Sequence, residues 1–464
     1  MRKKIVVIGA GIGGAGCGAL LAKAGHDVTV LESHPFEGGR CAAFEREGFS
    51  FDFGVHMFSR GEKGPLGVLN RELGGDLKWI TKDPACRVMG KMAFDFPLDI
   101  RSLFRQLTLA FNLKVGLKNY IGAFRLFTNL MKGRDIEAND PVLLDEYVAR
   151  FTDDESIHLF INCVSQLYFA LSSSEASAGE FIWCFSKMFN NAAFGYPRGG
   201  ARKIPRTFID ALSRFGGLVR FEETVSRIII ENNRATGVET DRNRYPADAV
   251  ISNAGLNRTI TLAGAENFPE AYVNTARGYR YSNPYVTVKY ALDRPLIPYP
   301  VVFYMPDVAS RHLFDYINQG SVPDDPYLFM PVPSNLDPGL APVVKQLVIA
   351  GTPVASGASN EICQQVLDRV HRRVCLLFPE LDKHILWQER STRADISRIT
   401  GHPEGGAIGL GQFPDQTGRN RPASETPVDG LWLVGADAGS RGIGTELAAG
   451  SAIHLVETLL RKWR

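Results

Sequence analysis

The hydrophobic pattern at the start of the chain predicts a strand, a helix and a second strand. The short apolar run Ile5 to Ile8 is typical of a parallel strand buried on both faces. A helical stretch rich in alanine and leucine follows it, and Gly25 ends that stretch. A second apolar run, Asp27 to Leu31, ends on Glu32. Elements in this order indicate an α/β domain with a parallel sheet.

Similar patterns return far along the chain. Ile204 to Phe215 predicts a helix, and Thr224 to Ile230 with Ala235 to Thr240 predicts two paired strands. Ala247 to Ser252 predicts another apolar strand, which ends in Asn253-Ala254-Gly255. A last buried strand leads into Gly435-Ala436-Asp437, and a helix from about Gly442 to Arg461 closes the chain.

Two other regions follow different patterns. Residues 70–190 predict mainly helices. Residues 260–424 alternate β-rich patches with Pro/Gly-rich loops, interrupted by one helix over about Glu361 to Leu377. The β-rich patches are Tyr285 to Leu292, Val301 to Tyr304, Tyr327 to Val332 and Gln346 to Ala350. We expect a second domain whose mixed sheet forms one wall of a substrate site.

The turn after the first strand carries a dinucleotide-binding pattern. Gly9-Ala10-Gly11-Ile12-Gly13-Gly14 fits G-x-G-x-x-G, whose glycines allow a tight turn and a close approach to a pyrophosphate at a helix N-terminus. Glu32 follows Gly14 by eighteen residues, near the spacing of about 20 expected for a carboxylate that binds a ribose. Because this carboxylate would repel a 2′-phosphate, the pattern argues against NADP.

The residues after the second strand indicate which dinucleotide is bound. Glu37-Gly38-Gly39-Arg40 stand where an NAD dehydrogenase would usually begin an ordinary helix. A glycine pair lets the backbone lie against a second part of an extended cofactor, and Arg40 can neutralise a phosphate. The stretch resembles the FAD-binding start of the amine oxidase and phytoene desaturase superfamily. We therefore expect FAD.

Composition narrows the class of protein further. The 464 residues are 45% hydrophobic and 22% charged, which allows two globular domains. A net charge of +2 gives no reason to expect a nucleic-acid partner. The seven cysteines are scattered, without a C-x-x-C pair or a histidine cluster, so we expect reduced thiols and no metal site. With no secretory segment before Ile5 and no apolar run near ~20 residues, we expect the cytoplasm or the cytoplasmic face of a membrane.

One segment, Ile100 to Arg134, carries cations without an intervening acid, interleaved with bulky apolar residues. The cations are Arg101, Arg105, Lys114, Lys118, Arg125, Lys132 and Arg134. Basic helices with bulky apolar faces are used in peripheral membrane contacts. The alternative is a pair of amphipathic helices that cover a core with solvated cations outside.

Two further stretches each leave two interpretations open. Ser165 to Phe185 is rich in aromatic and small residues. This composition predicts either the lining of an apolar substrate tunnel or an ordinary core helix. Glu47 to His56 predicts a strand running into a glycine turn and resembles the F-D-x-G stretch that passes near the flavin in the superfamily. Val55 and His56 are therefore expected near the ring, where His56 either moves protons or only packs and hydrogen-bonds.

Later motifs carry the same resemblance. Tyr196-Pro197-Arg198-Gly199-Gly200 resembles the aromatic-Pro-Arg-Gly-Gly turn of the bacterial phytoene desaturases. The resemblance implies that Arg198 faces the flavin, contacts its phosphate or braces the turn. In that family the strand containing Val225 meets the adenine through its backbone, and Asn253-Ala254-Gly255 matches another superfamily turn.

The closing motif also predicts a flavin contact. Asp437 can reach ribityl or phosphate-bridging groups, and Gly442-Ile443-Gly444 opens a helix whose N–H groups would face the flavin. Glu446 is either an acid favoured by the helix dipole or a site group. Phytoene desaturases usually carry a Gly-Thr-His-Pro-Gly turn here, whereas this chain has Asp437-Ala438-Gly439-Ser440-Arg441.

Together these motifs are similar to the phytoene desaturase and carotenoid isomerase-like branch of the FAD-dependent amine oxidase superfamily. The resemblance implies an α/β fold with a Rossmann-type FAD-binding domain built from residues 1–70, 195–260 and 425–464. Residues 71–194 and 261–424 would form the substrate domain, α+β in class, with a mixed sheet plus helices. The expected cofactor contacts are Gly9, Gly11, Ile12, Gly13, Gly14, Glu32, Ser33, Gly38, Gly39, Arg40, Val55, His56, Val225, Asn253, Ala254, Gly435, Asp437, Gly442, Ile443 and Gly444.

The resemblance implies dehydrogenation, saturation or isomerisation of a C–C bond in an apolar isoprenoid or carotenoid-like substrate, by hydride exchange with flavin N5. His56 and Arg198 are the candidate catalytic residues, and the electron acceptor stays open. The alternative is an amine-oxidase-like enzyme, which typically places a lysine near N5. The rough register puts Thr287 at that place, although Lys289 is on the same strand face. A non-enzymatic prenyl-protein escort is a third hypothesis, opposed by the intact flavin motifs.

Overall fold

Five parallel strands place their carboxyl ends along one edge of a sheet. The computed structural model describes residues 2–54, 57–191, 194–401, 405–439 and 441–464. The sheet has the order β19-β13-β1-β2-β9. Its strands are β1 (Lys4–Ile8), β2 (Asp27–Leu31), β9 (Leu218–Arg220), β13 (Ala249–Ser252) and β19 (Leu431–Leu433). The central strand β1 pairs in parallel with β2 and β13.

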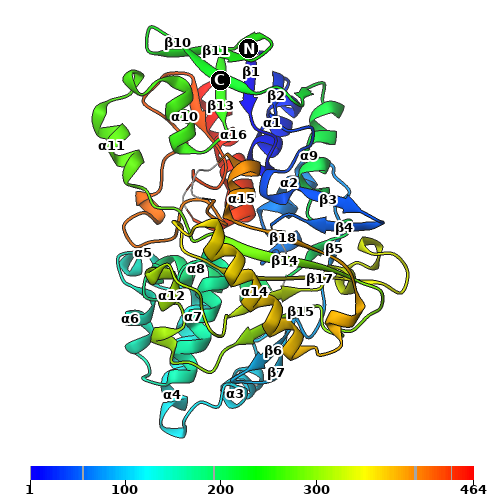
Figure 1. Cartoon of the computed structure of the whole chain (residues 1–464). Helices are drawn as coiled ribbons and strands as arrows, with labels where there is room; N and C mark the ends of the chain where they lie inside the picture. The colour runs from blue at the N-terminus through cyan, green and yellow to red at the C-terminus, as the bar shows by residue number, and fades with distance from the viewer. Residues whose placement is uncertain (1, 55–56, 192–193, 402–404, 440) are drawn as a thin grey trace.

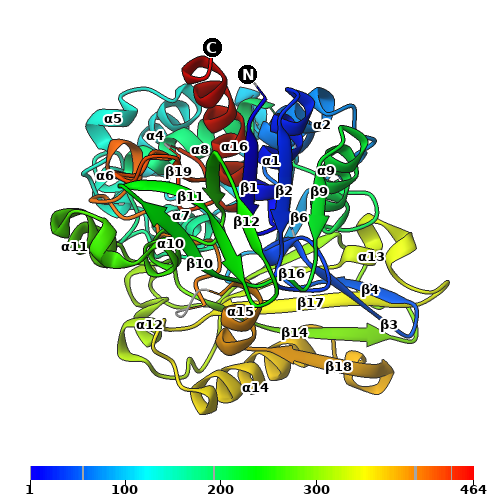
Figure 2. The same ribbon diagram turned by 90° about the horizontal axis from the view of Figure 1, so that it is seen from above.

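Both faces of this sheet are covered, which explains the continuous apolar runs in its strands. Ile5 and Val7 pack into a core with four helices on one face, and Val6 and Ile8 pack into a core on the other face. The four helices are α1 (Ile12–Lys23), α2 (Pro65–Glu72), α9 (Lys203–Arg214) and α16 (Gly444–Lys462). The opposite face carries the antiparallel sheet of β10 (Val225–Glu231), β11 (Arg234–Thr240) and β12 (Arg244–Pro246) and the helices α10 (Leu256–Ala263) and α11 (Glu270–Gly278) (Figure 2).

A mixed sheet of seven strands crosses the middle of the molecule (Figure 1). Its order is β18-β14-β17-β16-β15-β6-β7, and only the β6–β15 pair is parallel among its described strand pairs. The strands are β6 (Cys86–Gly90), β7 (Phe94–Phe96), β14 (Tyr285–Leu292), β15 (Val301–Met305), β16 (Leu328–Pro331), β17 (Gln346–Pro353) and β18 (Ile385–Ser391). The long helix α14 (Asn360–Leu377) packs on one face of this sheet.

The other face of the mixed sheet is covered by a group of helices at the far end from the termini (Figure 1). These helices are α3 (Leu103–Asn112), α4 (Tyr120–Lys132), α5 (Ile136–Asn139), α6 (Leu144–Ala149), α7 (Glu155–Phe169) and α8 (Ala178–Asn191). Residues 70–190 also contribute β6 and β7, and a short strand β5 (Trp79–Ile80) that pairs with β8 (Tyr196–Pro197). The region is mainly helical, as expected, but its short strands were not predicted, because strands of two to five residues are too short to show a period of two.

The segment from 100 to 134 forms α3, the short 3-10 helix η3 (Leu117–Asn119) and α4. One side of it is buried, with Leu109, Leu126 and Leu130 in the helical core. The other side is exposed and strongly apolar: Leu103, Phe104, Leu107, Phe111, Leu117, Ile121 and Phe124. None of the helices within the described ranges is long and apolar enough to cross a membrane.

Candidate functional site

A cavity of about 610 Å³ lies where the carboxyl ends of the parallel strands meet the mixed sheet. One wall consists of the turns after β1, β2, β13 and β19 and the first turn of α16. The opposite wall includes residues of α7, β14, β16, β17 and the helix α15 (Arg393–Thr400). Carboxyl ends of parallel strands are where open α/β sheets bind ligands.

Most of the residues predicted from the sequence line this cavity. They are Gly9, Gly11, Ile12, Gly13, Glu32, Ser33, Gly38, Gly39, Arg40, Val225, Asn253, Ala254, Gly435, Asp437, Ile443 and Gly444. They come from segments more than 400 residues apart in the chain, which the parallel sheet brings to one edge.

The glycine loop leaves the first turn of α1 open toward the cavity. Gly11 caps α1 without a side-chain hydrogen bond, and the first turn contains no acid. Its N–H groups and the positive end of the helix dipole are therefore available to an anion. Gly14 lies behind the wall, where a Cβ atom would come 2.0 Å from the Gly9 carbonyl oxygen. Gly14 therefore permits the close packing of helix and strand rather than ligand contact.

Glu32 ends β2 with its carboxylate already oriented by the backbone. Its Oε2 accepts a hydrogen bond from the Ala10 N–H at 2.8 Å, and Oε1 accepts one from the His34 N–H at 3.0 Å. The side chain is buried yet lines the cavity. Because Oε1 also accepts a hydrogen bond from the Ser33 hydroxyl at 3.2 Å, the lone pair left for a ribose hydroxyl is on Oε2. Asp437 is held similarly, since the Leu256 and Leu410 N–H groups donate to it.

Arg40 presents a buried donor to the cavity. Its Nη2 donates to the Gly406 carbonyl at 3.2 Å, whereas Nε is buried without a hydrogen-bond partner. Burial lowers the pKa of the Arg40 guanidinium, while Asp437 opposes that shift. A buried cationic donor with an unused N–H, opposite the open turn of α1, fits an extended ligand that carries phosphate groups.

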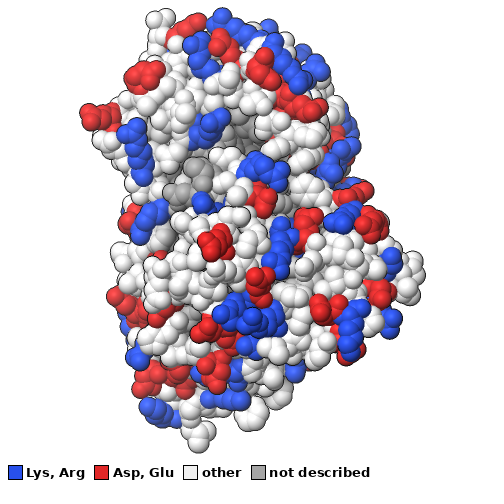
Figure 3. Space-filling model, viewed as in Figure 1, with Lys and Arg blue, Asp and Glu red and all other residues white. Residues whose placement is uncertain are grey.

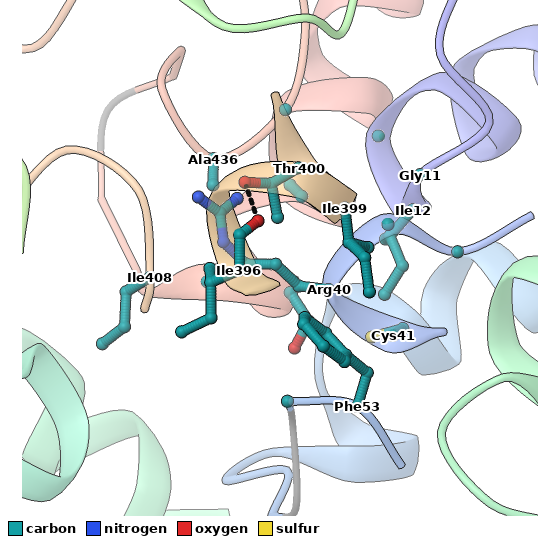
Figure 4. Close-up of a pocket in the computed structure, with 18 of the residues that line it drawn as sticks. Gly11, Ile12, Arg40, Cys41, Phe53, Ile396, Ile399, Thr400, Ile408 and Ala436 are labelled. Atoms are coloured by element: carbon teal, nitrogen blue, oxygen red, sulfur yellow. Dashed lines mark hydrogen bonds between the residues drawn. The ribbon is translucent and has the colours of Figure 1, made fainter. Parts of the chain in front are cut away.

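Helix α15 was not predicted from the sequence, although it covers the cavity. Ile396, Ile399 and Thr400 line it, and Figure 4 shows Ile399 beside Ile12 while Arg40 extends toward Ala436. The helix begins with a capping box between Thr392 and Asp395. The sequence Thr-x-x-Asp was the available signal.

Several predicted residues are not brought to the main cavity. Gly442 lies beside it and donates its N–H to Glu180 Oε1 at 2.7 Å. Arg198 is exposed and outside the wall, and its backbone N–H donates to the Lys78 carbonyl. Of the three roles that the resemblance implies for Arg198, bracing of the turn agrees best with an exposed side chain outside the wall, and a contact with the cofactor stays a prediction. Val55 and His56 lie outside the described residues.

The strand that would carry an amine oxidase lysine is β14. Thr287 lines the cavity, and its Oγ1 is buried without a hydrogen-bond partner. Lys289 is fully buried and is not among the residues of the wall. Its Nζ donates to Ser391 Oγ at 2.6 Å and lies 3.6 Å from Glu389, and burial lowers its pKa.

One group of potential metal ligands lies away from this cavity. Within the described ranges, His371, Cys375 and Asp382 bring their ligand atoms within 4.8 Å of one another. The Tyr290 hydroxyl lies 3.2 Å from His371 Nδ1. These residues belong to α14 and the segment after it, and none of them lines the cavity.

Comparisons with known proteins identify the family. Residues 16–455 match the model of the flavin-containing amine oxidoreductase family. The zeta-carotene-forming phytoene desaturase of Myxococcus xanthus is 27% identical over 94% of this chain and 89% of that protein. The chloroplastic prolycopene isomerase of Daucus carota is 24% identical over 93% of this chain and 75% of that protein.

Solved structures share the fold. An oxidoreductase from Methanosarcina mazei has a TM-score of 0.75 at 23% identity, covering 98% of this chain and 100% of that one. A putrescine oxidase variant has a TM-score of 0.71 at 14% identity, covering 100% of this chain and 99% of that one.

The chain belongs to the flavin-containing amine oxidoreductase family. It is an FAD-dependent oxidoreductase, and its curated relatives confirm the resemblance to the phytoene desaturase and carotenoid isomerase-like branch. The open turn of α1, Glu32 and the unused Nε of Arg40 are the residues that would hold the cofactor.

Proposed function

We propose that this enzyme dehydrogenates, saturates or isomerises C–C bonds of an apolar isoprenoid or carotenoid-like substrate. The observation that carries the proposal is the wall opposite the glycine loop. It is lined by apolar and aromatic side chains that include Leu167, Tyr168, Tyr285, Phe329 and Ile349. Bound FAD supplies hydride exchange, and these side chains would exclude water and align a hydrocarbon chain.

The same wall argues against oxidation of amines. No lysine is present among the described residues that line the cavity. On β14 the residue that faces the cavity is Thr287, whereas the side chain of Lys289 is fully buried in the protein. The relatives whose names state polyene substrates match most of this chain, including the phytoene desaturase and prolycopene isomerase named above.

The test is anaerobic absorption spectroscopy of the FAD-loaded protein. Detergent-solubilised phytoene and lycopene are added to one sample and putrescine to another. Bleaching of the flavin by an isoprenoid supports the proposal in the desaturating direction, and reoxidation of chemically reduced flavin by a polyene supports it in the saturating direction. Bleaching by putrescine alone would overturn it in favour of amine oxidation.

We further infer that the exposed apolar side of α3, η3 and α4 docks on a membrane surface, from which such a substrate would be taken. Phe104 is 78% exposed, Phe111 73% and Leu117 89%, on neighbouring turns of one surface. The cations of this segment contribute less than the sequence indicates, because acids outside it approach them. Arg101 pairs with Asp99 at 2.7 Å and Lys118 with Asp153 at 3.3 Å.

Vesicle co-sedimentation tests this surface. Burying one phenylalanine in the interface contributes about 1.5–3 kcal/mol, so Phe104→Ser with Phe111→Ser should weaken binding at least tenfold. Leu376→Ser is the matched control, since Leu376 is 63% exposed on α14. Because the charges are mixed (Figure 3), raised salt should weaken wild-type binding only slightly. Unchanged binding of the double variant would exclude this surface.

A further inference from the structure

The first turn of α16 places a carboxylic acid between two hollows of the protein. Glu446 lines the main cavity and also a small adjoining pocket. Aromatic side chains of α7 and α8 surround that pocket: Tyr168, Phe169, Phe181, Trp183 and Phe185. The Glu446 side chain is only 6% exposed. An acid in such surroundings has no water to solvate its charge.

One oxygen of this carboxyl group is fixed and the other is free. Oε1 accepts a hydrogen bond from the Arg60 N–H at 3.2 Å. Oε2 is buried without a hydrogen-bond partner. The space for it depends on Gly64, where a Cβ atom would come 2.4 Å from Oε2. The group is therefore held through Oε1, while Oε2 keeps lone pairs that no protein donor uses and that can take up a proton.

Glu446 differs from the other ionisable groups described around the small pocket in that its charge changes near neutral pH. Burial raises the pKa of Glu446 to about 7, although the Arg60 guanidinium and the backbone N–H groups of Arg60 and Gly61 pull it down. That guanidinium lies over the Trp183 ring, 5.6 Å from its centroid. Burial raises the pKa of both Tyr168 and Cys184 well above their usual values, so both stay neutral.

We propose that Glu446 is the catalytic proton carrier of the cavity, a role that rests on the C–C chemistry of the proposed function. In desaturation one substrate carbon loses a hydrogen with its electron pair, which the oxidised flavin accepts. The C–H bond on the neighbouring carbon breaks, its electron pair becomes the second bond of the new alkene, and its proton passes to the Glu446 carboxylate. Saturation runs the same steps in reverse, with the neutral acid as donor.

Infrared titration tests the group itself without any substrate. The FAD-loaded wild-type protein should show a protonated carboxyl band that disappears as pH rises through about 7. Glu446→Gln keeps the hydrogen-bond acceptor for Arg60 and should lack that component. Glu457→Gln, an exposed glutamate on the same helix, should retain it. A band that does not titrate, or one that persists in Glu446→Gln, overturns the proposal.

Flavin reduction by the isoprenoid that bleaches the wild-type enzyme tests the role. Loss of a general base typically costs 10²–10⁴-fold, so Glu446→Gln should slow bleaching at least a hundredfold with FAD still bound. The wild-type rate should rise with pH through about 7, and the variant rate should be flat. Wild-type rates in Glu446→Gln overturn the role while leaving the proposed function intact. If no isoprenoid bleaches or reoxidises the wild-type flavin, the proposed function fails and this role with it.

Discussion

The two walls of the cavity are built in different ways. The wall toward the parallel sheet comes from short stretches, Gly9 to Gly13 and Gly38 to Arg40, and offers mainly backbone N–H groups and Cα atoms. The opposite wall collects side chains from α7, β14, β16 and α15, which are scattered over more than 200 residues. We expect the first wall to hold the cofactor and the second to contact the substrate.

This difference decides how a substitution acts. On the glycine wall an added atom collides with backbone, which cannot move aside, so small changes have large effects. On the opposite wall a substitution changes the polarity or shape of the cavity and leaves the backbone in place. Predictions for the two walls therefore differ in kind as well as in size.

The largest effect is expected at Gly14. In Gly14→Ala the new methyl would lie 2.0 Å from the Gly9 carbonyl oxygen, so α1 must move away from β1. Overpacking against backbone should cost about 3 kcal/mol of unfolding free energy, the upper end of the usual range, and the purified protein should lack flavin absorbance. Thermal unfolding and the visible spectrum measure both effects.

Gly278→Ala is the control for that variant. Gly278 ends α11, and a Cβ atom there would meet nothing within 4 Å. It should retain FAD and change the unfolding free energy by at most about 1 kcal/mol. A flavin-loaded Gly14→Ala protein of normal stability would contradict this account of the glycine wall.

The contrast between the walls also explains how much was predictable from sequence. Gly9, Gly11, Gly13, Glu32 and Arg40 were predicted from local motifs and line the cavity, whereas Gly14, predicted as a contact, lies behind the wall. The strand Tyr285–Leu292 was predicted with its observed bounds, and Thr287 lies on the cavity. The strands β5, β6 and β7 were missed, because their positions depend on tertiary pairing rather than on local periodicity, and the role of Arg198 stays a prediction.

At the junction of the two walls, stability should depend on the charge of Glu446. Burial raises its pKa in the folded protein to about 7, above about 4.3 in the unfolded chain. The neutral form thus stabilises the fold at low pH, and that contribution is lost as pH rises through about 7. Relative to Glu446→Gln, the wild-type protein should lose about 2.5 kcal/mol between about pH 5 and about pH 8.

Chemical denaturation at several pH values measures this difference. Glu457→Gln should follow the wild-type curve, since Glu457 is exposed. Parallel curves for the wild-type protein and Glu446→Gln would show that the carboxyl group keeps an ordinary pKa, contrary to the prediction.

A smaller effect is expected at the start of α15, which belongs to the opposite wall. The Thr392 side chain caps this helix together with Asp395. Thr392→Ala should cost about 1 kcal/mol and loosen Ile396 and Ile399 over the cavity. Hydrogen exchange should then accelerate in α15 and stay unchanged in α1. Equal acceleration in both helices would show that the two walls open together.

The smallest effect is expected at Lys289. An amine-oxidase-like enzyme would need a lysine in the cavity, and Lys289 does not line it. The ammonium group is fully buried behind the wall, held by Ser391 and Glu389 and within 5.8 Å of the Phe53 ring centroid. Removing one partner of an ion pair is costly when the other partner stays buried, but Glu389 is 38% exposed, so water can solvate its carboxylate once the ammonium group is gone. Lys289→Met should therefore change stability by no more than about 1 kcal/mol and leave bleaching by an isoprenoid within about twofold of wild type, since a group outside the wall takes no part in proton transfer. A large loss of flavin reduction with FAD still bound would place this lysine in the chemistry and favour oxidation of a C–N bond.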